Sequence, residues 1–175
     1  TSIGDQAFGR CIALTSITIP ESVTSIDATA FEGCKALTSI TIPDSVTSIG
    51  DQAFSNCIAL TSITIPDSVT NIGIRAFEKC GALTSVTLSG SIPSVKLETF
   101  KECAVLTSIT IPENVVRIGR DAFYECAALE SITIENPECK IFDDDATICN
   151  SEPNPIIPST FTGTIYGSKD STAQA

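Results

Sequence analysis

Cysteine is the residue type of this chain best suited to chemistry, because a thiolate can act as a nucleophile, a metal ligand or a disulfide partner. The chain contains no histidine, which excludes Ser-His and Cys-His nucleophile pairs and most zinc sites. We therefore predict no enzyme activity, no catalytic residue, no bound metal and no cofactor. Seven of the eight cysteines recur every 23 residues: Cys11, Cys34, Cys57, Cys80, Cys103, Cys126 and Cys149.

The segments around the cysteines repeat with the same spacing. A phenylalanine precedes each of the first six cysteines by three residues, and a leucine follows it by three. A constant period of this length indicates a solenoid, in which each coil buries its apolar face only against its neighbours. The two accompanying columns are Phe8, Phe31, Phe54, Phe77, Phe100 and Phe123, and Leu14, Leu37, Leu60, Leu83, Leu106 and Leu129.

The stacking of coils argues against disulfides within the cysteine column. Coils that pair like strands lie about 4.8 Å apart, with equivalent side chains pointing the same way, whereas a disulfide needs Cβ atoms aimed at each other. We predict that Cys11 to Cys126 are buried free thiols that donate weakly to backbone carbonyls. Cys139 lies off the column, and a disulfide from it to Cys149 or Cys126 stays open.

The sequence of one repeat predicts two short extended segments, a turn between them and a helical turn at the end. In the unit from Leu37, the alternation of Ile40 and Ile42 with polar residues predicts a strand. Proline then favours a turn, and 46–49 predicts a second extended piece with Val46 and Ile49 inward. Residues 51–57 are too short for an α-helix and predict a helical turn, with Asp51 as its cap.

The repeat divides the chain into a solenoid and a terminal segment. A partial repeat (1–13), five regular repeats (14–128) and a degenerate repeat (129–151) form a solenoid over 1–151, and 152–175 is expected to be a truncated C-terminal capping segment. The chain opens partway through a repeat, which predicts a fragment of a longer protein. In the unit from Leu83, Ser89-Gly90-Ser91 and Lys96-Leu97 depart from the pattern, so we expect a bulge there.

The repeat LTSITIPDSVTSIGDQAFSNC at 37–57 closely resembles the BspA-type leucine-rich repeat. The resemblance implies a right-handed superhelix with a parallel β-sheet on its concave face and short strands on the convex side. It also implies a surface or secreted protein of the kind linked to adhesion and to host matrix proteins. An extracellular or cell-surface location is therefore expected.

The acidic balance limits the partners of the chain. With 21 acidic and 10 basic residues the net charge is −11, which disfavours nucleic acid and anionic membranes. No apolar run reaches the roughly 18 residues of a membrane span. Protein or glycan ligands remain the expected partners.

The outward positions of the predicted sheet carry serine and threonine, and they are our candidate ligand surface. A regular hydroxyl array could dock an extended ligand, or it could simply suit a solvated strand face. The alternatives for the chain are a non-catalytic adhesion scaffold or a structural spacer that presents another domain. The candidate residues are Ser16, Thr18, Ser39, Thr41, Ser62, Thr64, Ser85, Thr87, Ser108, Thr110, Ser131 and Thr133.

Two other regions could hold specificity, the acidic loop at 143–145 and the irregular region at 96–101. Glu21, Asp44, Asp67 and Glu113 share one repeat position, and calcium could relieve their mutual repulsion, although each turn offers a single carboxylate. We expect solvated turns there, and likewise a solvated loop at the acidic run 143–145. The irregular region at 96–101 is the other candidate.

Overall fold

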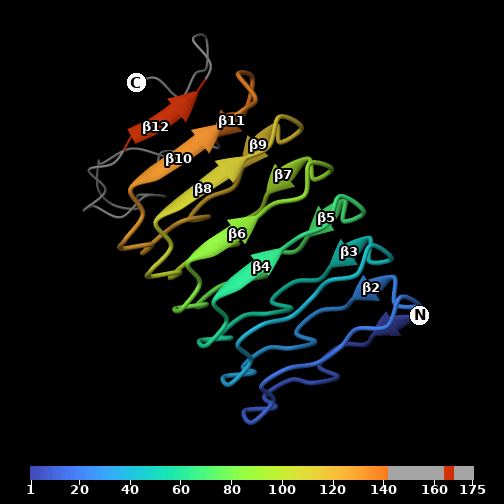
Figure 1. The fold of residues 1–175 in the computed structure, drawn as a ribbon. Helices are drawn as coiled ribbons and strands as arrows, with labels where there is room; N and C mark the ends of the chain where they lie inside the picture. Colours follow the sequence, from blue (N-terminus) through green and yellow to red (C-terminus); the bar gives the residue numbers. More distant parts are fainter. Residues whose placement is uncertain (142–163, 168–175) are drawn as a thin grey trace.

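The computed structural model describes residues 1–141 and 164–167, which form a stack of similar coils. From Leu60 onward each coil passes through two short strands, whereas the coils from Leu14 and Leu37 contain one each, so the stack carries two lines of strands (Figure 1). The first line contains β4 (Ser62–Thr64), β6 (Ser85–Thr87), β8 (Ser108–Ile111), β10 (Ser131–Ile134) and β12 (Thr164–Gly167). The second line contains β1 (Ser2–Ile3), β2 (Ser25–Ile26), β3 (Ser48–Ile49), β5 (Asn71–Ile72), β7 (Ser94–Val95), β9 (Arg117–Ile118) and β11 (Lys140–Ile141).

Strands pair in parallel with the repeat as their register. Ser62 pairs with Ser85 and Ser108 with Ser131, while an isolated bridge joins Thr18 to Thr41. β12 continues the first line by pairing with β10. This arrangement confirms the predicted leucine-rich-repeat solenoid with parallel strands along one face and short strands along another.

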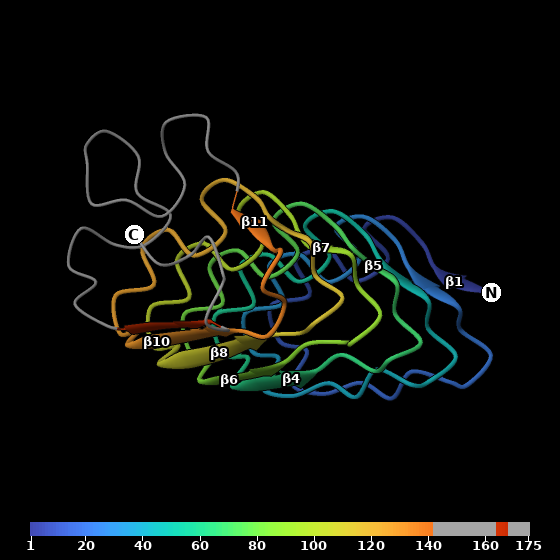
Figure 2. The same ribbon diagram turned by 90° about the horizontal axis from the view of Figure 1, so that it is seen from above.

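The two lines of strands lie on opposite sides of the coils (Figure 2). The buried apolar side chains of the coils form one core cluster. In the coil from Leu37, the side chains of Leu37, Val46, Ile49 and Phe54 are fully buried. The phenylalanine rings form a continuous stack, with centroids 5.2 to 5.7 Å apart and planes within 6° of parallel. Every coil interior therefore depends on the coils before and after it, as the strict period predicted.

The predicted helical turn is wrong. Residues 51–57 instead form consecutive tight turns, in which Gln52 and Asn56 have φ of 56° and 62°. The N–H groups of Gln52, Phe54 and Asn56 all donate to carbonyls of the next coil rather than along a helix. Asp51 does not cap its own turn either, because its carboxylate accepts from the N–H of Ile74 at 2.8 Å. This segment is thus a third ladder of inter-coil hydrogen bonds.

Candidate ligand-binding surface

The candidate serines and threonines lie on one face, which we call the hydroxyl face. It is formed by the outward side chains of the first strand line and of the equivalent positions in the two preceding coils. All twelve are exposed except Ser131 and Thr133, which are half-buried on β10 between β8 and β12. Ser85 and Thr87 of β6 lie opposite Ser62 and Thr64 of β4, so equivalent hydroxyls form two rows across the coils. The structure thus brings these residues together, and their role in binding stays a prediction.

A neighbouring threonine row was missed by the sequence analysis. The hydroxyls of Thr38, Thr61 and Thr84 donate to backbone carbonyls of the preceding coil at 3.0 to 3.4 Å. Such donation fixes one coil on the next and leaves these hydroxyls less available to a ligand. These threonines recur every 23 residues in the sequence, but the candidate serines and threonines have the same spacing, so the spacing alone did not distinguish the two sets.

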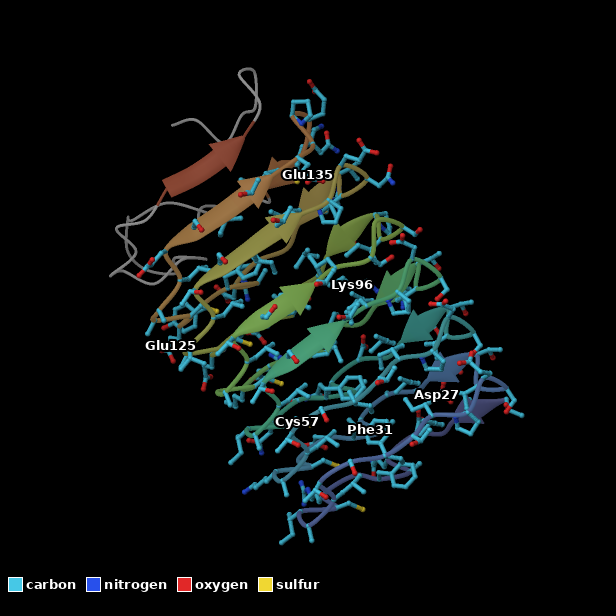
Figure 3. All side chains as sticks on the ribbon, in the orientation of Figure 1. Asp27, Phe31, Cys57, Lys96, Glu125 and Glu135 are labelled. Atoms are coloured by element: carbon cyan, nitrogen blue, oxygen red, sulfur yellow. The ribbon has the colours of Figure 1, made fainter. Side chains whose placement is uncertain are left out.

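The hydroxyl face is hollowed where the coils from Leu83 and Leu106 meet. A depression of about 440 Å³ is lined by candidate residues of β6 and β8, and Glu135 is also part of its lining. Glu135 follows β10 and is labelled in Figure 3. The sequence analysis did not include Glu135, which gives this hollow its acidic group. The candidate residues that line the hollow are Ser85, Thr87, Ser108 and Thr110.

The cysteine column is structural rather than reactive. The thiol of Cys57 is fully buried and donates to the Phe31 carbonyl at 3.2 Å. Each of the other buried column thiols likewise donates to the carbonyl of the phenylalanine 26 residues earlier. Burial raises the pKa of Cys57 to about 12, so the thiolate that would react is strongly disfavoured. Figure 3 shows Cys57 near Phe31, on the side of the coils away from Asp27.

Two cysteines depart from this description. Cys11, in the first coil, is exposed, so the prediction of burial is wrong at this position. Cys139 is a buried free thiol, and burial raises its pKa to about 11. Cys126 is also a free thiol, whereas Cys149 lies outside the described residues.

Of the acidic turn residues, Asp67 contacts the backbone of the next coil. The Asp67 carboxylate accepts from the Gly90 N–H at 2.8 Å, which joins two successive turns. Within residues 1–141, no three acidic or cysteine side chains gather closely enough to hold a metal ion. The acidic run at 143–145 lies outside the described residues.

A second hollow lies on the other strand line. It has a volume of about 420 Å³ and is lined by Lys96, Arg117 and Arg120 together with apolar side chains of Ile74, Val95 and Leu97. Lys96 directly follows β7 and is labelled in Figure 3. The irregular region that the sequence analysis singled out at 96–101 therefore borders a cationic hollow, which we call the basic hollow.

The rest of that region forms ion pairs along the turn edge. Glu98 is bound by Arg75 of the preceding coil and by Lys101 at 3.3 Å. Burial favours the neutral acid, but the hydrogen bonds from Arg75 and Lys101 outweigh it and lower the pKa of Glu98. Lys101 also lies 5.4 Å from the Tyr124 ring centre, a cation–π contact. These charges are satisfied within the protein.

A family model matches most of the chain. The BspA type leucine rich repeat region matches in six copies, over residues 1–130 and 72–166. This chain therefore belongs to the BspA-type leucine-rich-repeat family. No curated protein matches it. No helix within the described residues is long and apolar enough to cross a membrane.

Several solved bacterial proteins are similar to this chain. A Treponema pallidum leucine-rich-repeat protein is 26% identical with a TM-score of 0.66, covering 87% of this chain and 73% of its own. A leucine-rich cell surface protein from Faecalibacterium prausnitzii is 25% identical with a TM-score of 0.51, covering 93% of this chain. The pneumococcal vaccine antigen PcpA is 29% identical with a TM-score of 0.64, covering 71% of this chain. The chain spans 62% of the Faecalibacterium chain and 31% of PcpA.

Proposed function

We propose that this chain is a non-catalytic interaction scaffold of a surface-displayed or secreted protein, and that it binds host matrix proteins or glycans through the hydroxyl face. The observation that carries the proposal is the pair of exposed hydroxyl rows, hollowed at the coils from Leu83 and Leu106. A similar protein from Faecalibacterium is described as a cell surface protein, which supports the proposed location.

The mechanism follows from repetition. The hydroxyl rows lack Tyr, Trp and Arg, the residues that dominate compact binding hot spots. Each hydroxyl can donate or accept one weak bond, so affinity comes from many equivalent contacts on a rigid surface. Such a surface suits an extended or repetitive ligand better than a small molecule.

The test is a binding assay of the purified chain against immobilised host matrix proteins and glycans. A variant carrying Thr41→Lys, Thr64→Lys and Thr87→Lys places three long cationic side chains across the hydroxyl face. The matched control carries Ile58→Lys, Gly81→Lys and Ala104→Lys, which adds the same charge in the repeat column that naturally holds Lys35. Binding lost in the first variant and kept in the second supports the proposal.

The alternative is a structural spacer that presents another domain of a larger protein. The partial coverage of the relatives favours it, because those chains extend well beyond the matched repeats. If the unaltered chain binds none of the immobilised ligands, the spacer becomes the better explanation. Equal loss of binding in both triple variants would also count against the hydroxyl face.

A further inference from the structure

At the basic hollow, Lys96 occupies a repeat position that is glycine in most other coils. Asp27 holds the same position in an earlier coil, and its N–H still donates to the preceding coil, to Ile3, at 2.9 Å. Gly50, Gly73 and Gly119 press against the preceding coil, where an added Cβ would lie 2.3 to 2.7 Å from backbone atoms. Their N–H groups donate to that coil at 2.7 to 2.9 Å. Lys96 occupies the same repeat position, and among the described residues no such bond is found from its N–H. The coil therefore stands away from its neighbour at this point.

Two backbone N–H groups at the basic hollow lack the carboxylate acceptor that two other coils provide. The N–H groups of Ala28 and Ile74 are accepted by the carboxylates of Asp5 and Asp51, each 23 residues earlier, at 3.1 and 2.8 Å. Leu97 and Arg120 hold the same repeat position as Ile74 in the next two coils. The residue 23 positions before Leu97 is Ile74, and the residue 23 positions before Arg120 is Leu97. Neither aliphatic side chain can accept a hydrogen bond. Both N–H groups belong to residues that line the basic hollow.

The hollow concentrates positive charge in an acidic chain. Three of the ten basic residues line it, and Lys140 pairs in register with Arg117 at its margin. The Lys96 ammonium donates to the neutral Asn71 side chain at 2.6 Å, so its charge is not neutralised by that contact. Arg120 lies 3.6 Å from Asp121, whose pKa burial raises, while no residue that lines the hollow is acidic.

We infer that the basic hollow is a docking site for an acidic peptide segment that also carries aliphatic side chains. Its carboxylates would meet Lys96, Arg120 and the backbone donors. Its aliphatic groups would contact Ile74 and Leu97, the apolar lining residues that are at least partly exposed.

The apolar lining favours a peptide over a sulfated glycan. Sulfated glycans present closely spaced anionic groups to clusters of cations, whereas part of this lining offers only dispersion and hydrophobic contact. The hollow is within the volume range of ligand sites in proteins. It lies on the second strand line, so its occupancy is independent of the hydroxyl face.

The test measures binding of a fluorescein-labelled peptide of alternating Glu and Leu to the full chain. The salt concentration is about 50 mM, so that attraction between exposed charges is only weakly screened. The comparison probes are the same peptide with Gln for Glu, and a heparin oligosaccharide. The variants are Lys96→Gly, which restores the repeat residue, and Arg120→Gln. The control is Lys35→Gln, which removes one exposed positive charge outside the hollow.

The proposal predicts a tenfold or larger rise in Kd for the Glu-Leu peptide in both hollow variants, and little change in Lys35→Gln. The Gln-Leu peptide should bind at least tenfold more weakly. An absence of Glu-Leu binding would overturn the proposal. So would equal weakening by Lys35→Gln, or tighter binding of heparin that displaces the peptide, which would indicate a sulfated glycan site. Arg120→Gln keeps the test decisive if Lys96→Gly alters folding, as judged by its melting curve.

Discussion

The coil from Leu60 and the coil from Leu83 have the same interior and different surfaces. Phe77 and Phe100 are both fully buried in the ring stack, and Cys80 and Cys103 donate to the preceding coil at the same distance of 3.3 Å. The outer turns differ, because the second coil has no proline at Ser89 and no glycine at Lys96. Residues of this second coil line both hollows described above.

The comparison distinguishes the core positions, which hold the solenoid together, from the turn positions, which differ from coil to coil. The core columns must repeat, because each ring and thiol contacts its equivalent one coil away. The turn positions are free to vary wherever the coils can move slightly apart. Specificity in such a scaffold is therefore expected at departures from the repeat rather than at its most regular positions.

The largest predicted effect tests the claim that both coils share one core. Phe77→Ala and Phe100→Ala should each lower the free energy of unfolding by about 3–5 kcal/mol, because each removes a fully buried ring from the stack. Urea unfolding followed by circular dichroism measures the loss. A much smaller loss for Phe100→Ala would mean that the irregular coil is not packed like its neighbour. Phe8→Ala is the control, since its half-buried ring contacts one stacked neighbour among the described residues.

The next prediction concerns the glycine position that distinguishes the two coils. An alanine Cβ at Gly73 would lie 2.3 Å from the Asp51 nitrogen, so Gly73→Ala should destabilise by about 2–3 kcal/mol. Lys96→Ala, at the equivalent position, should change stability by less than about 0.5 kcal/mol. Melting temperatures of the two variants give the comparison. Equal losses would contradict the claim that the coils separate at Lys96.

A third prediction contrasts two acids at one repeat position, Glu98 and Asp121. Asp121 is buried, and its Oδ1 has no hydrogen-bond partner within the described residues. Burial raises the pKa of Asp121, opposed in part by Arg120. The neutral acid therefore stabilises the fold below its unfolded pKa of about 3.9, and this contribution is lost as the pH rises through the folded pKa.

Asp121→Asn should consequently raise stability at pH 7 by about 1 kcal/mol, and by little or nothing below pH 4. The pH dependence of stability has the opposite sign for Glu98, because its pKa is lowered in the folded state. The ionised Glu98 stabilises the fold above its unfolded pKa, and this contribution is lost as the pH falls through the folded pKa. Glu98→Gln should thus destabilise at pH 7. Urea midpoints measured across this pH range test both variants, and parallel pH profiles would refute the contrast.

The sequence predicted the fold because every core column is visible as a 23-residue repeat. It failed at residues 51–57, where the spacing of Ala53, Phe54 and Cys57 is compatible with a helical turn. The left-handed backbone at Gln52 is not encoded in residue type, since equivalent positions hold Thr29, Arg75 and Glu98. Inter-coil hydrogen bonds stabilise it, and these depend on the stacked neighbours.

The candidate surface was predictable in part for the same reason. Alternation along the strands was enough to place Ser39 and Thr41 outward. The hollows were not predictable, because they depend on how closely neighbouring coils approach. That distance is set by contacts such as Gly73 against the Asp51 nitrogen, which only the three-dimensional arrangement reveals.

The smallest predicted effect sharpens the comparison at the second left-handed position. This column contains Gly33 with φ of 69°, Asn56 with 62° and Glu102 with 60°. Glycine adopts this conformation without the Cβ penalty, and asparagine tolerates it better than glutamate. Glu102→Gly should therefore raise the free energy of unfolding by about 0.5–1 kcal/mol through the backbone. The loss of the ion pair between Glu102 and Lys79 reduces this gain.

Asn56→Gly, in a regular coil, should gain only a few tenths of a kcal/mol, and Asn56→Ala should lose stability. The urea midpoints of the three variants give the order of their stabilities. This order is expected from the backbone conformation at the substituted residue. Asn56 in the coil from Leu37 and Glu102 in the coil from Leu83 share the same left-handed turn backbone, so the order should hold although the surfaces of these coils differ. Stabilisation by Asn56→Ala would show that the conformation at this column is not left-handed.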